Sequence, residues 1–539
     1  MLRLTELKLP LDHAPDALRP AIVQRLGIVD ADLLNFSLFK RSYDARKRFG
    51  DMPFIYSIDC EVRDEAAVLA RLAQDPHVNP APDMRYKPAG QAPAGGLEER
   101  PLVVGFGPCG IFAALILAQA GLRPIVLERG KEVRQRTKDT WGLWRKNVLN
   151  AESNVQFGEG GAGTFSDGKL YSQIKDPKYL GRKVLEEFVK AGAPEEILYV
   201  SKPHIGTFRL TGVVASMREE IKALGGEVRF QQRVSDLLLE EGQLQGVVLD
   251  NGEQLSSRHV ILALGHSSRD TFRMLHARGV YMEAKPFSVG FRIEHPQSLI
   301  DRARLGKYAG HPKLGAADYK LVHHAKNGRS VYSFCMCPGG TVVAATSEPE
   351  RVVTNGMSQY SRNERNANAG IVVGITPEQD YPGGPLAGVE LQERLESQAY
   401  VLGGRNYEAP GQLVGDFIQG KPSTALGEVV PSYKPGVRLG DLAPSLPDFA
   451  IEAIREAIPA FAKQIKGFDL ADAVLTGIET RTSSPLRITR DDNLQSLNTR
   501  GLYPAGEGAG YAGGILSAGV DGIRVAEAVV RDMLGLAKA

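Results

Sequence analysis

Apolar and polar residues follow two different periods in the first 87 residues. Stretches with a period of two, as over residues 54–62, predict half-buried strands, whereas spacings of three and four predict helices. The resulting order is strand, helix, strand, strand, helix, strand, which is typical of the ferredoxin-like α+β arrangement. The expected elements are strands at residues 2–9, 36–41 and 54–62 and near Met84, and helices at residues 17–26 and 64–73.

A second pattern begins at residue 102, where a short apolar run enters a glycine-rich turn. An apolar helix follows over residues 111–120, and a second strand over residues 124–127 ends on Glu128. A strand, a Gly-x-Gly-x-x-Gly turn, a helix, a strand and a terminal acid, in this order, indicate a dinucleotide-binding βαβ unit. This full context is much more specific than the three glycines alone.

Each residue type in the turn has a physical reason for its place. Gly105 permits a sharp turn, Gly107 lets a pyrophosphate approach the backbone, and Gly110 lets the helix pack close to the strand. Pro108 is tolerated because the first turn of a helix has no N–H partner to lose. The positive end of the helix then favours an anion.

Glu128 stands where a carboxylate accepts the ribose hydroxyls of an adenine dinucleotide. An acid at this position favours NAD or FAD over a cofactor with a 2′-phosphate. Arg129, next to it, is the type of residue that binds such a phosphate. These residues alone leave NAD and FAD as alternatives.

Three later segments have the composition of ligand-facing backbone. Residues 158–170 combine glycines with apolar residues that anchor a loop. Residues 260–264 predict a buried parallel strand whose terminal Gly265 approaches a ligand. Residues 501–515 repeat the order strand, glycine-rich crossing and helix, so we expect a second helix N-terminus to point at the same ligand.

Short alternating runs between residues 280 and 480 predict an antiparallel sheet inserted between two halves of the dinucleotide-binding fold. We therefore expect an α/β protein of three units. They are an N-terminal α+β domain (1–87) with a linker (88–99), a dinucleotide-binding domain in two parts (100–282 and 481–539), and a β-rich substrate or cap domain (283–480).

The composition narrows the function classes. A chain of 539 residues is too long for one core and can bury a large ligand. Its net charge of +2 gives no general reason to expect nucleic acid. Four cysteines do not make a disulfide framework in such a chain, which favours the cytoplasm. The N-terminus lacks the apolar core of a signal peptide, and no apolar segment is long enough to cross a membrane.

A basic stretch over residues 40–48 interleaves five cations with one tyrosine. Such a stretch can bind RNA or an anionic substrate. We favour a solvated loop as the explanation, because acids on the same domain balance much of the charge. We expect a small-molecule substrate, with nucleic acid as the alternative, and the sequence does not indicate the oligomeric state.

Residues suited to chemistry are scattered along the chain. Cys335 and Cys337 have no second Cys/His pair at ligand spacing, so we expect buried free thiols and no metal site. Histidine suits proton transfer near neutral pH. The candidate proton donors are His295, His323, His324, Lys285 and Glu348, and the candidate ligands for an anionic substrate are Arg481 and Arg487.

Three motifs together resemble the FAD-binding domain of the glutathione-reductase-like flavoprotein superfamily. They are Gly105-x-Gly107-x-x-Gly110 with Glu128, the strand at 260–265, and Tyr503-Pro504-Ala505-Gly506-Glu507. Residues 158–170, 292–296 and 337–340 look more narrowly like a poorly characterised family of bacterial FAD-dependent dehydrogenases with an N-terminal α+β domain. The resemblance covers nearly the whole chain and implies an FAD-dependent oxidoreductase that passes a hydride through flavin N5.

The resemblance also implies where the flavin is bound, with Glu507 as the acid on its ribitol. NADH or NADPH is a candidate electron donor at the same flavin face, because the sequence holds no second dinucleotide motif. Two alternatives stay open: a dehydrogenase that uses NAD alone, and a flavoprotein that binds RNA through its N-terminal domain. The expected cofactor contacts are Gly105, Gly107, Pro108, Gly110, Glu128, Arg129, Gly160, Gly161, Ser166, Lys169, Val234, Ala263, Gly265, Gly506, Glu507, Gly513, Gly514 and Ile515.

Overall fold

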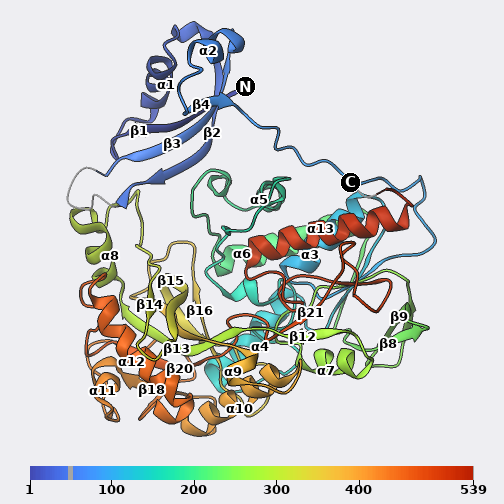
Figure 1. Ribbon diagram of the computed structural model, residues 1–539, viewed down its shortest axis with the longest axis vertical. Coiled ribbons are helices and arrows are strands. Elements are labelled where there is room, and N and C mark those ends of the chain that lie inside the picture. The colour runs from blue at the N-terminus through green and yellow to red at the C-terminus, as the bar shows by residue number, and fades with distance from the viewer. Residues whose placement is uncertain (46–51, 538–539) are drawn as a thin grey trace.

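The computed structural model describes residues 1–45 and 52–537 (Figure 1). Its N-terminal unit is a four-stranded sheet with the strand order β2-β3-β1-β4, in which β1 runs antiparallel to β3 and β4. The elements follow one another as the sequence predicts. They are β1 (Leu2–Leu9), α1 (Leu18–Leu26), β2 (Leu33–Tyr43), β3 (Phe54–Val62), α2 (Glu65–Arg71) and β4 (Val78–Pro80).

The last of these strands lies earlier than the sequence analysis places it. We predicted a strand near Met84, whereas β4 ends at Pro80. The reason is that β4 pairs with the first residues of β1, which fixes its position along the chain. This pairing places the side chain of Val78 in the hydrophobic core of the unit. Residues 81–101 then contain no helix or strand and lead to the second unit.

The second unit is built on a five-stranded sheet in the order β22-β11-β5-β6-β7, in which all neighbouring strands are parallel. Successive residues point to opposite faces. In β5, Val103 belongs to one hydrophobic core, whereas Leu102 and Val104 belong to another. Both faces are therefore buried. The strands are β5 (Leu102–Val104), β6 (Ile125–Glu128), β7 (Glu227–Phe230), β11 (Val260–Leu262) and β22 (Leu502–Pro504).

Helices cover one face of this sheet, and a small sheet with one helix covers the other. Helices α3 and α13 lie side by side (Figure 1). A Cβ atom on Gly522 would lie 2.3 Å from the carbonyl oxygen of Cys109, so glycine permits this close packing. The covering elements are α3 (Pro108–Gln119), α4 (Val133–Lys146), α5 (Leu180–Lys190), α6 (Thr207–Ala223), α13 (Ile515–Met533), β8 (Val234–Glu240), β9 (Gln243–Leu249), β10 (Gln254–Ser256) and α7 (Arg269–Ala277).

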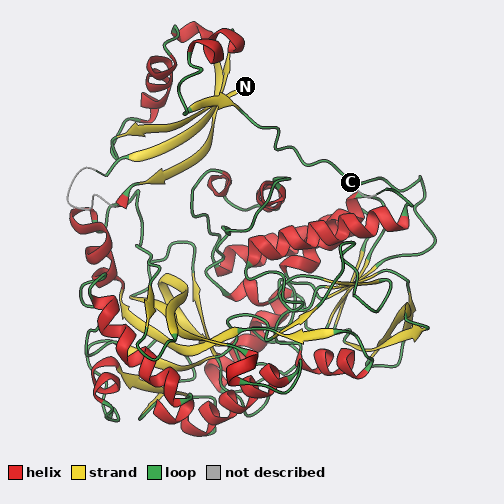
Figure 2. Cartoon of the chain, in the orientation of Figure 1, coloured by secondary structure: helices red, strands yellow, loops and turns green. Residues whose placement is uncertain are grey.

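The third unit, the cap, is an eight-stranded sheet with β13 and β17 paired over ten residues at its centre. Its helices lie along the left and lower sides of these strands in Figure 2. The strands are β13 (Phe287–Pro296), β14 (Val322–His324), β15 (Ser330–Ala344), β16 (Thr354–Ser358), β17 (Asn366–Ile375), β18 (Ala409–Leu413), β19 (Val437–Leu439) and β20 (Val474–Glu479), and the helices are α8 (Gln297–Leu305), α9 (Pro377–Asp380), α10 (Ala387–Leu402), α11 (Val414–Gln419) and α12 (Asp448–Ala462).

The cap sheet departs from the predicted antiparallel sheet in one pair, because β18 and β19 run parallel. Helix α11 and the segment after it lie between these two strands and return the chain to the starting edge, as a parallel pair requires. The two connections to the rest of the molecule lie together, since β12 (Met282–Ala284) pairs with β21 (Leu486–Ile488). The chain therefore leaves and re-enters the second unit at one place.

The N-terminal unit contacts the rest of the molecule through the end of β2. The backbone of Arg41 exchanges hydrogen bonds with Tyr199 and Ser201, and its guanidinium lies 5.3 Å from the Tyr199 ring centre. Part of the predicted basic stretch at 40–48 falls outside the described residues. No helix in the described part of the chain has the length and apolar character needed to cross a membrane.

Candidate active site

A cavity of about 360 Å³ lies where the carboxyl ends of the parallel strands meet the cap. The first residues of two helices line it: Gly107 and Pro108 at the start of α3, and Gly514 and Ile515 at the start of α13. Helix N-termini carry unpaired N–H groups and the positive end of the dipole. The cavity therefore receives two positive helix ends, which suits an extended anionic ligand.

Three glycines leave open space beside the cavity. A Cβ atom on Gly265, Gly513 or Gly514 would meet no heavy atom within 4 Å, and none of the three has a left-handed backbone. Neither backbone conformation nor packing therefore requires glycine at these positions. All three line the cavity, so the space that they leave is available to a ligand.

The glycine-rich loop after α4 touches the dinucleotide turn directly. A Cβ atom on Gly161 would lie 2.9 Å from the Cα atom of Gly107. The loop is held by the buried guanidinium of Arg136, which donates to the carbonyl oxygens of Val155 and Glu159, each at 2.6 Å. The loop is thus fixed against the protein with one face on the cavity, and Phe165 is buried beneath it.

Glu128 ties three segments together at the end of β6. Its Oε2 atom accepts the Phe106 N–H at 2.9 Å, and its Oε1 atom accepts the N–H groups of Gly130 and Gly158 at 2.8 and 2.9 Å. A carboxylate offers about four acceptor positions. One position therefore remains, and Glu128 lines the cavity.

Arg129 also lines the cavity, but two acids share its charge. It pairs with Asp270 at 2.8 Å and with Glu152 at 3.0 Å, and its guanidinium lies 4.0 Å from the centre of the Phe157 ring. Because its charge is already paired, Arg129 is poorly suited to a 2′-phosphate.

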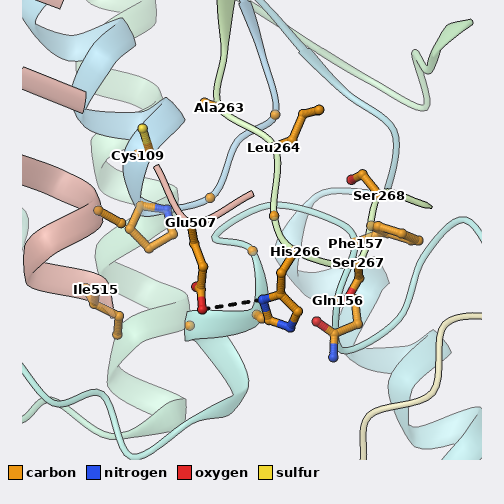
Figure 3. Close-up of a pocket in the computed structure, with 18 of the residues that line it drawn as sticks. Cys109, Gln156, Phe157, Ala263, Leu264, His266, Ser267, Ser268, Glu507 and Ile515 are labelled. Carbon is orange, nitrogen blue, oxygen red and sulfur yellow. Dashed lines mark ion pairs between the residues drawn. The ribbon is translucent and has the colours of Figure 1, made fainter. Parts of the chain in front are cut away.

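His266 and Glu507 meet at the cavity wall (Figure 3). The Nδ1 atom of His266 lies 3.5 Å from the Oε1 atom of Glu507. His266 follows β11 and Glu507 follows β22, and these strands are parallel neighbours. Carboxyl ends of neighbouring parallel strands share one edge of the sheet, which brings the two side chains together.

The cap contributes Phe334, Cys335 and Asn355 to the cavity wall. Arg292 of β13 positions two of them, since it donates to the Cys335 carbonyl at 2.7 Å and to the Asn355 side chain at 3.1 Å. The Lys169 ammonium donates to the carbonyl oxygen of Met336, between the two cysteines. A hydrogen bond from Cys337 and the nearby cations Arg292 and Lys169 hold the pKa of the Cys335 thiol well below its usual value.

Arg481 lines the cavity at the junction with the cap. Its guanidinium donates to Glu396 at 2.8 and 2.9 Å, to Ser347 at 2.7 Å and to Ser267 at 2.9 Å. Arg269 holds the same carboxylate of Glu396 from the other side at 2.7 Å. The network braces the loop after β11 against α10.

Fifteen of the eighteen expected cofactor contacts line the cavity, and Gly110, Gly160 and Gly506 do not. These three pack against protein instead. A Cβ atom on Gly110 would lie 1.9 Å from the Gly105 carbonyl oxygen. A Cβ atom on Gly160 would lie 2.1 Å from the Thr164 side chain, and one on Gly506 would lie 2.9 Å from the Cys109 side chain. Glycine at these three positions thus permits close packing around the cavity.

None of the five expected proton donors lines the cavity. His295 is fully buried in the cap, where it contacts the Phe468 carbonyl at 2.7 Å and burial lowers its pKa to about 4. His323 pairs with Glu456 at 2.9 Å and His324 is exposed. Glu348 pairs with Arg269 at 2.5 Å.

Lys285 and Arg487 also lie outside the cavity lining. The Lys285 ammonium is 3.4 Å from the Ser483 hydroxyl, and burial with the nearby Arg487 lowers its pKa. Arg487 lies 5.4 Å from the centre of the Tyr511 ring. Of the two arginines expected to bind an anionic substrate, the structure brings only Arg481 to the cavity.

The sequence analysis missed His266 and the exposure of Cys335. His266 directly follows Gly265, the predicted end of a ligand-facing strand, so its position was a usable signal. Cys335 was expected to be buried, but a bulge in β15 turns it partly outward, whereas Cys337 is buried. No group of three or more potential metal ligands occurs among residues 1–45 and 52–537.

The chain is 49% identical over 530 residues to a protein of Clostridium beijerinckii that bears the name "Uncharacterized protein", and the match covers 98% of each chain. Residues 286–482 match the family model of the FAD-dependent protein, C-terminal domain-like. Residues 1–61 match the model of a domain of unknown function. The match to the FAD-dependent protein family begins just before β13 and ends after β20, and thus spans the cap.

Among solved structures the chain is similar to the E. coli quinol fumarate reductase FrdA, at 13% identity and a TM-score of 0.37, over 82% of this chain and 71% of that chain. It is similar to the glycine oxidase of Geobacillus kaustophilus at 13% identity and a TM-score of 0.35, over 82% and 96%. It is also similar to the L-proline dehydrogenase of P. horikoshii, at 12% identity and a TM-score of 0.33, over 82% of this chain and 100% of that chain.

Proposed function

This chain belongs to the family of the Clostridium beijerinckii protein, and we propose that it is an FAD-dependent oxidoreductase whose flavin lies in the cavity between the parallel sheet and the cap. On this proposal the parallel sheet and its helices are a Rossmann-like FAD-binding domain of the glutathione-reductase type. The cap is the substrate domain, and the N-terminal unit is a ferredoxin-like domain. The match of residues 286–482 to a domain of FAD-dependent proteins supports the choice of cofactor.

The observation that carries the proposal is the meeting of two distant helix starts in one cavity. Pro108 begins α3 and Ile515 begins α13, and both residues line the same space. A flavin dinucleotide carries negative charge at its pyrophosphate and, once reduced, at its ring, so it suits two separate positive helix ends. The open space beside Gly265, Gly513 and Gly514 fits such a ligand.

Particular residues would hold the parts of the cofactor. The free acceptor position of Glu128 would take the adenosine ribose, and Gly107 with the α3 N-terminus would take the pyrophosphate. Glu507 would bind the ribitol. Gly161 and Gly514 would border the ring, since each has no side chain to cover the cavity.

FAD, when bound, supplies two-electron chemistry with hydride transfer at its N5 atom. The chain itself provides position and electrostatics. The N-terminus of α13 favours negative charge in the cavity, because its first residues line the cavity and Gly513 and Gly514 have no side chain to cover them. Phe334 of the cap and Ile515 add apolar wall, which helps to keep water from the reacting atoms.

We further propose a small-molecule substrate that enters from the cap side, and a cytoplasmic location. Arg481 lines the cavity together with Arg129, Lys169 and Arg233, and Glu396 already accepts hydrogen bonds from its guanidinium at 2.8 and 2.9 Å. Its charge is therefore largely neutralised, and its role on this proposal is to position the cavity wall. NADH or NADPH remains the proposed class of electron donor.

Purification of the full chain tests the proposal directly. We expect a yellow protein that releases about one FAD per chain on denaturation, as one cavity for one dinucleotide requires. Anaerobic stopped-flow mixing with NADH, NADPH and candidate substrates should then bleach the flavin absorbance. A colourless protein that binds NAD instead would support the dehydrogenase that uses NAD alone.

A further inference from the structure

Cys335 and Cys337 form a pair of unequal thiols on the cap side of the cavity. Cys335 lines the cavity and is partly exposed, whereas Cys337 is buried behind it. The Cys337 thiol donates to the Cys335 carbonyl oxygen at 3.3 Å, so the two residues are in direct contact. A cavity-lining cysteine thus has a second cysteine beside it.

The backbone holds this arrangement at some conformational cost. Cys335 has a φ of 41°, in the left-handed region, and β15 is irregular between Phe334 and Cys337. A residue other than glycine at such an angle is uncommon and is enriched at functional sites. The bulge is what directs Cys335 to the cavity while Cys337 stays in the core.

Charged groups from several elements face the pair. Lys169 comes from the glycine-rich loop and Arg292 from β13, and both favour an anionic sulfur at Cys335. Glu479 of β20 pairs with Arg292 at 2.8 Å, and burial raises its pKa to about 7. Asp167 lies 3.9 Å from Lys169 and pairs with Arg362. The cations that stand closest to Cys335 therefore outweigh the acids.

We propose that Cys335 and Cys337 are an attacking and a resolving thiol that reduce a small disulfide bound in the cavity. Attack by a thiolate followed by closure onto a neighbouring thiol is the general course of thiol–disulfide exchange. The exposed, cation-flanked sulfur with a buried partner beside it fits this chemistry.

The exchange balances without a further reactant. The Cys335 thiolate attacks one sulfur of the substrate, RS–SR, which forms the Cys335–SR bond and releases RS⁻. The Cys337 thiol gives its proton to RS⁻ and attacks the Cys335 sulfur, which forms the Cys335–Cys337 disulfide and releases a second RS⁻. The protein loses two electrons, and the substrate becomes one RSH and one RS⁻.

Return of the pair to its starting state takes two electrons and one proton, which is what one anionic reduced flavin releases on oxidation to FAD. This return rests on the proposed function, whereas the exchange itself does not. The other two cysteines are less suited to attack, although Cys109 also lines the cavity. Cys60 is buried in the N-terminal sheet, and burial raises the pKa of Cys60 to about 12 and that of Cys109 well above its usual value.

The test is a single turnover of the full chain, with its thiols reduced beforehand, against dipyridyl disulfide, whose released thiol absorbs light. We expect a fast release of two thiol equivalents per chain, and peptide mapping should then find a Cys335–Cys337 disulfide. Cys337→Ser should release one equivalent and keep a mixed disulfide on Cys335. Cys335→Ser should lose the fast phase, and Cys60→Ser should behave like the unchanged protein.

Lys169→Met gives a second readout. Loss of this cation should raise the pKa of the attacking thiol and slow the fast phase about tenfold at a pH below that pKa. The proposal is overturned if Cys335→Ser keeps the fast phase, or if mapping of the unchanged protein finds no link between the two cysteines. FAD content is measured on the same samples, so a flavin-free protein that still exchanges would fail only the proposed function.

Discussion

The carboxylate of Glu507 lies 3.5 Å from the Nδ1 atom of His266, and these two side chains join the ends of β22 and β11 at the cavity. The pair lies beside the start of α13, where we propose the flavin ring (Figure 3). A carboxylate at this place opposes the extra negative charge of a reduced flavin, whereas the helix end favours it. On the proposed placement of the flavin, Glu507 would therefore lower the potential of the bound cofactor.

Glu507→Gln should raise the midpoint potential of the bound flavin, because removal of the carboxylate charge favours the reduced anion. We expect a rise of about 30 mV for the two-electron couple, which corresponds to about 1.4 kcal/mol. Spectroscopic redox titration measures it. Glu219→Gln removes an exposed acid of α6 that does not line the cavity and should leave the potential unchanged. An unchanged potential in Glu507→Gln would place the flavin ring and ribitol away from this residue.

Gly265→Val should abolish flavin binding with little effect on the fold. Its side chain would enter the open space beside the cavity, where a Cβ atom meets nothing within 4 Å. We expect the FAD content to fall about tenfold or more, because filling a binding site costs more than the 1.4 kcal/mol that a factor of ten represents. The thermal unfolding temperature of the flavin-free protein should stay within a few degrees.

Gly374→Val is the matched control for Gly265→Val. Gly374 lies on β17 of the cap, a Cβ atom there also meets nothing within 4 Å, and it does not line the cavity. This variant should keep its FAD. Equal loss of FAD in both variants would show that the effect comes from the fold and would contradict the proposed site.

Glu396→Gln should destabilise the protein strongly. Glu396 is fully buried between the guanidinium groups of Arg269 and Arg481. Its loss leaves Arg269 and Arg481 to share the single carboxylate of Glu348, so one buried cation lacks its own partner, which costs about 3–5 kcal/mol. Chemical denaturation measures the change in the free energy of unfolding. Glu390→Gln, on the exposed face of the same helix α10, should change it by no more than about 0.5 kcal/mol.

The stability of the protein should fall in mild acid because of His295. Burial lowers its pKa to about 4 from an ordinary value of 6.5, so the folded state keeps it neutral while the unfolded state takes up a proton. The free energy of unfolding should therefore decrease as pH falls from about 6.5 to about 4, by about 3 kcal/mol in total. Above pH 6.5 His295 is neutral in both the folded and the unfolded state, so it does not change the free energy of unfolding there.

His295→Gln should reduce the loss of unfolding free energy between pH 6.5 and pH 4. Glutamine keeps a donor for the Phe468 carbonyl and does not titrate in this range. Urea unfolding at a series of pH values measures the slope. His324→Gln removes an exposed histidine of the same unit and should keep the slope of the unchanged protein. A slope that survives in His295→Gln would assign the acid sensitivity to other groups.

Local patterns were sufficient for the dinucleotide unit. The run at 102–104, the glycine turn, the apolar helix and the strand ending at Glu128 all appear as elements at those places. Their periods are local, so neighbouring residues alone specify them. The last strand of the N-terminal unit was misplaced, because its position depends on the edge of β1 and not on its own composition.

The sequence predicted the glycines of the candidate site but not its proton donors. Glycine positions 107, 161, 265, 513 and 514 were predictable, because a missing side chain is visible in the sequence wherever the chain folds. Proton donors were not predictable, since a histidine looks the same whether it is buried against Phe468 or meets an acid at a cavity wall.

The sequence by itself determined the strands of the dinucleotide unit and three of the four strands of the N-terminal unit, which turns carry glycine, and which two helices begin beside those turns. Only the tertiary structure decided that those two helix starts share one cavity, that His266 meets Glu507, and that Cys335 faces outward while Cys337 is buried. The physical reason is that strand order and the bulge in β15 are set by packing between distant segments. The local period of apolar residues does not predict which distant segments pack together.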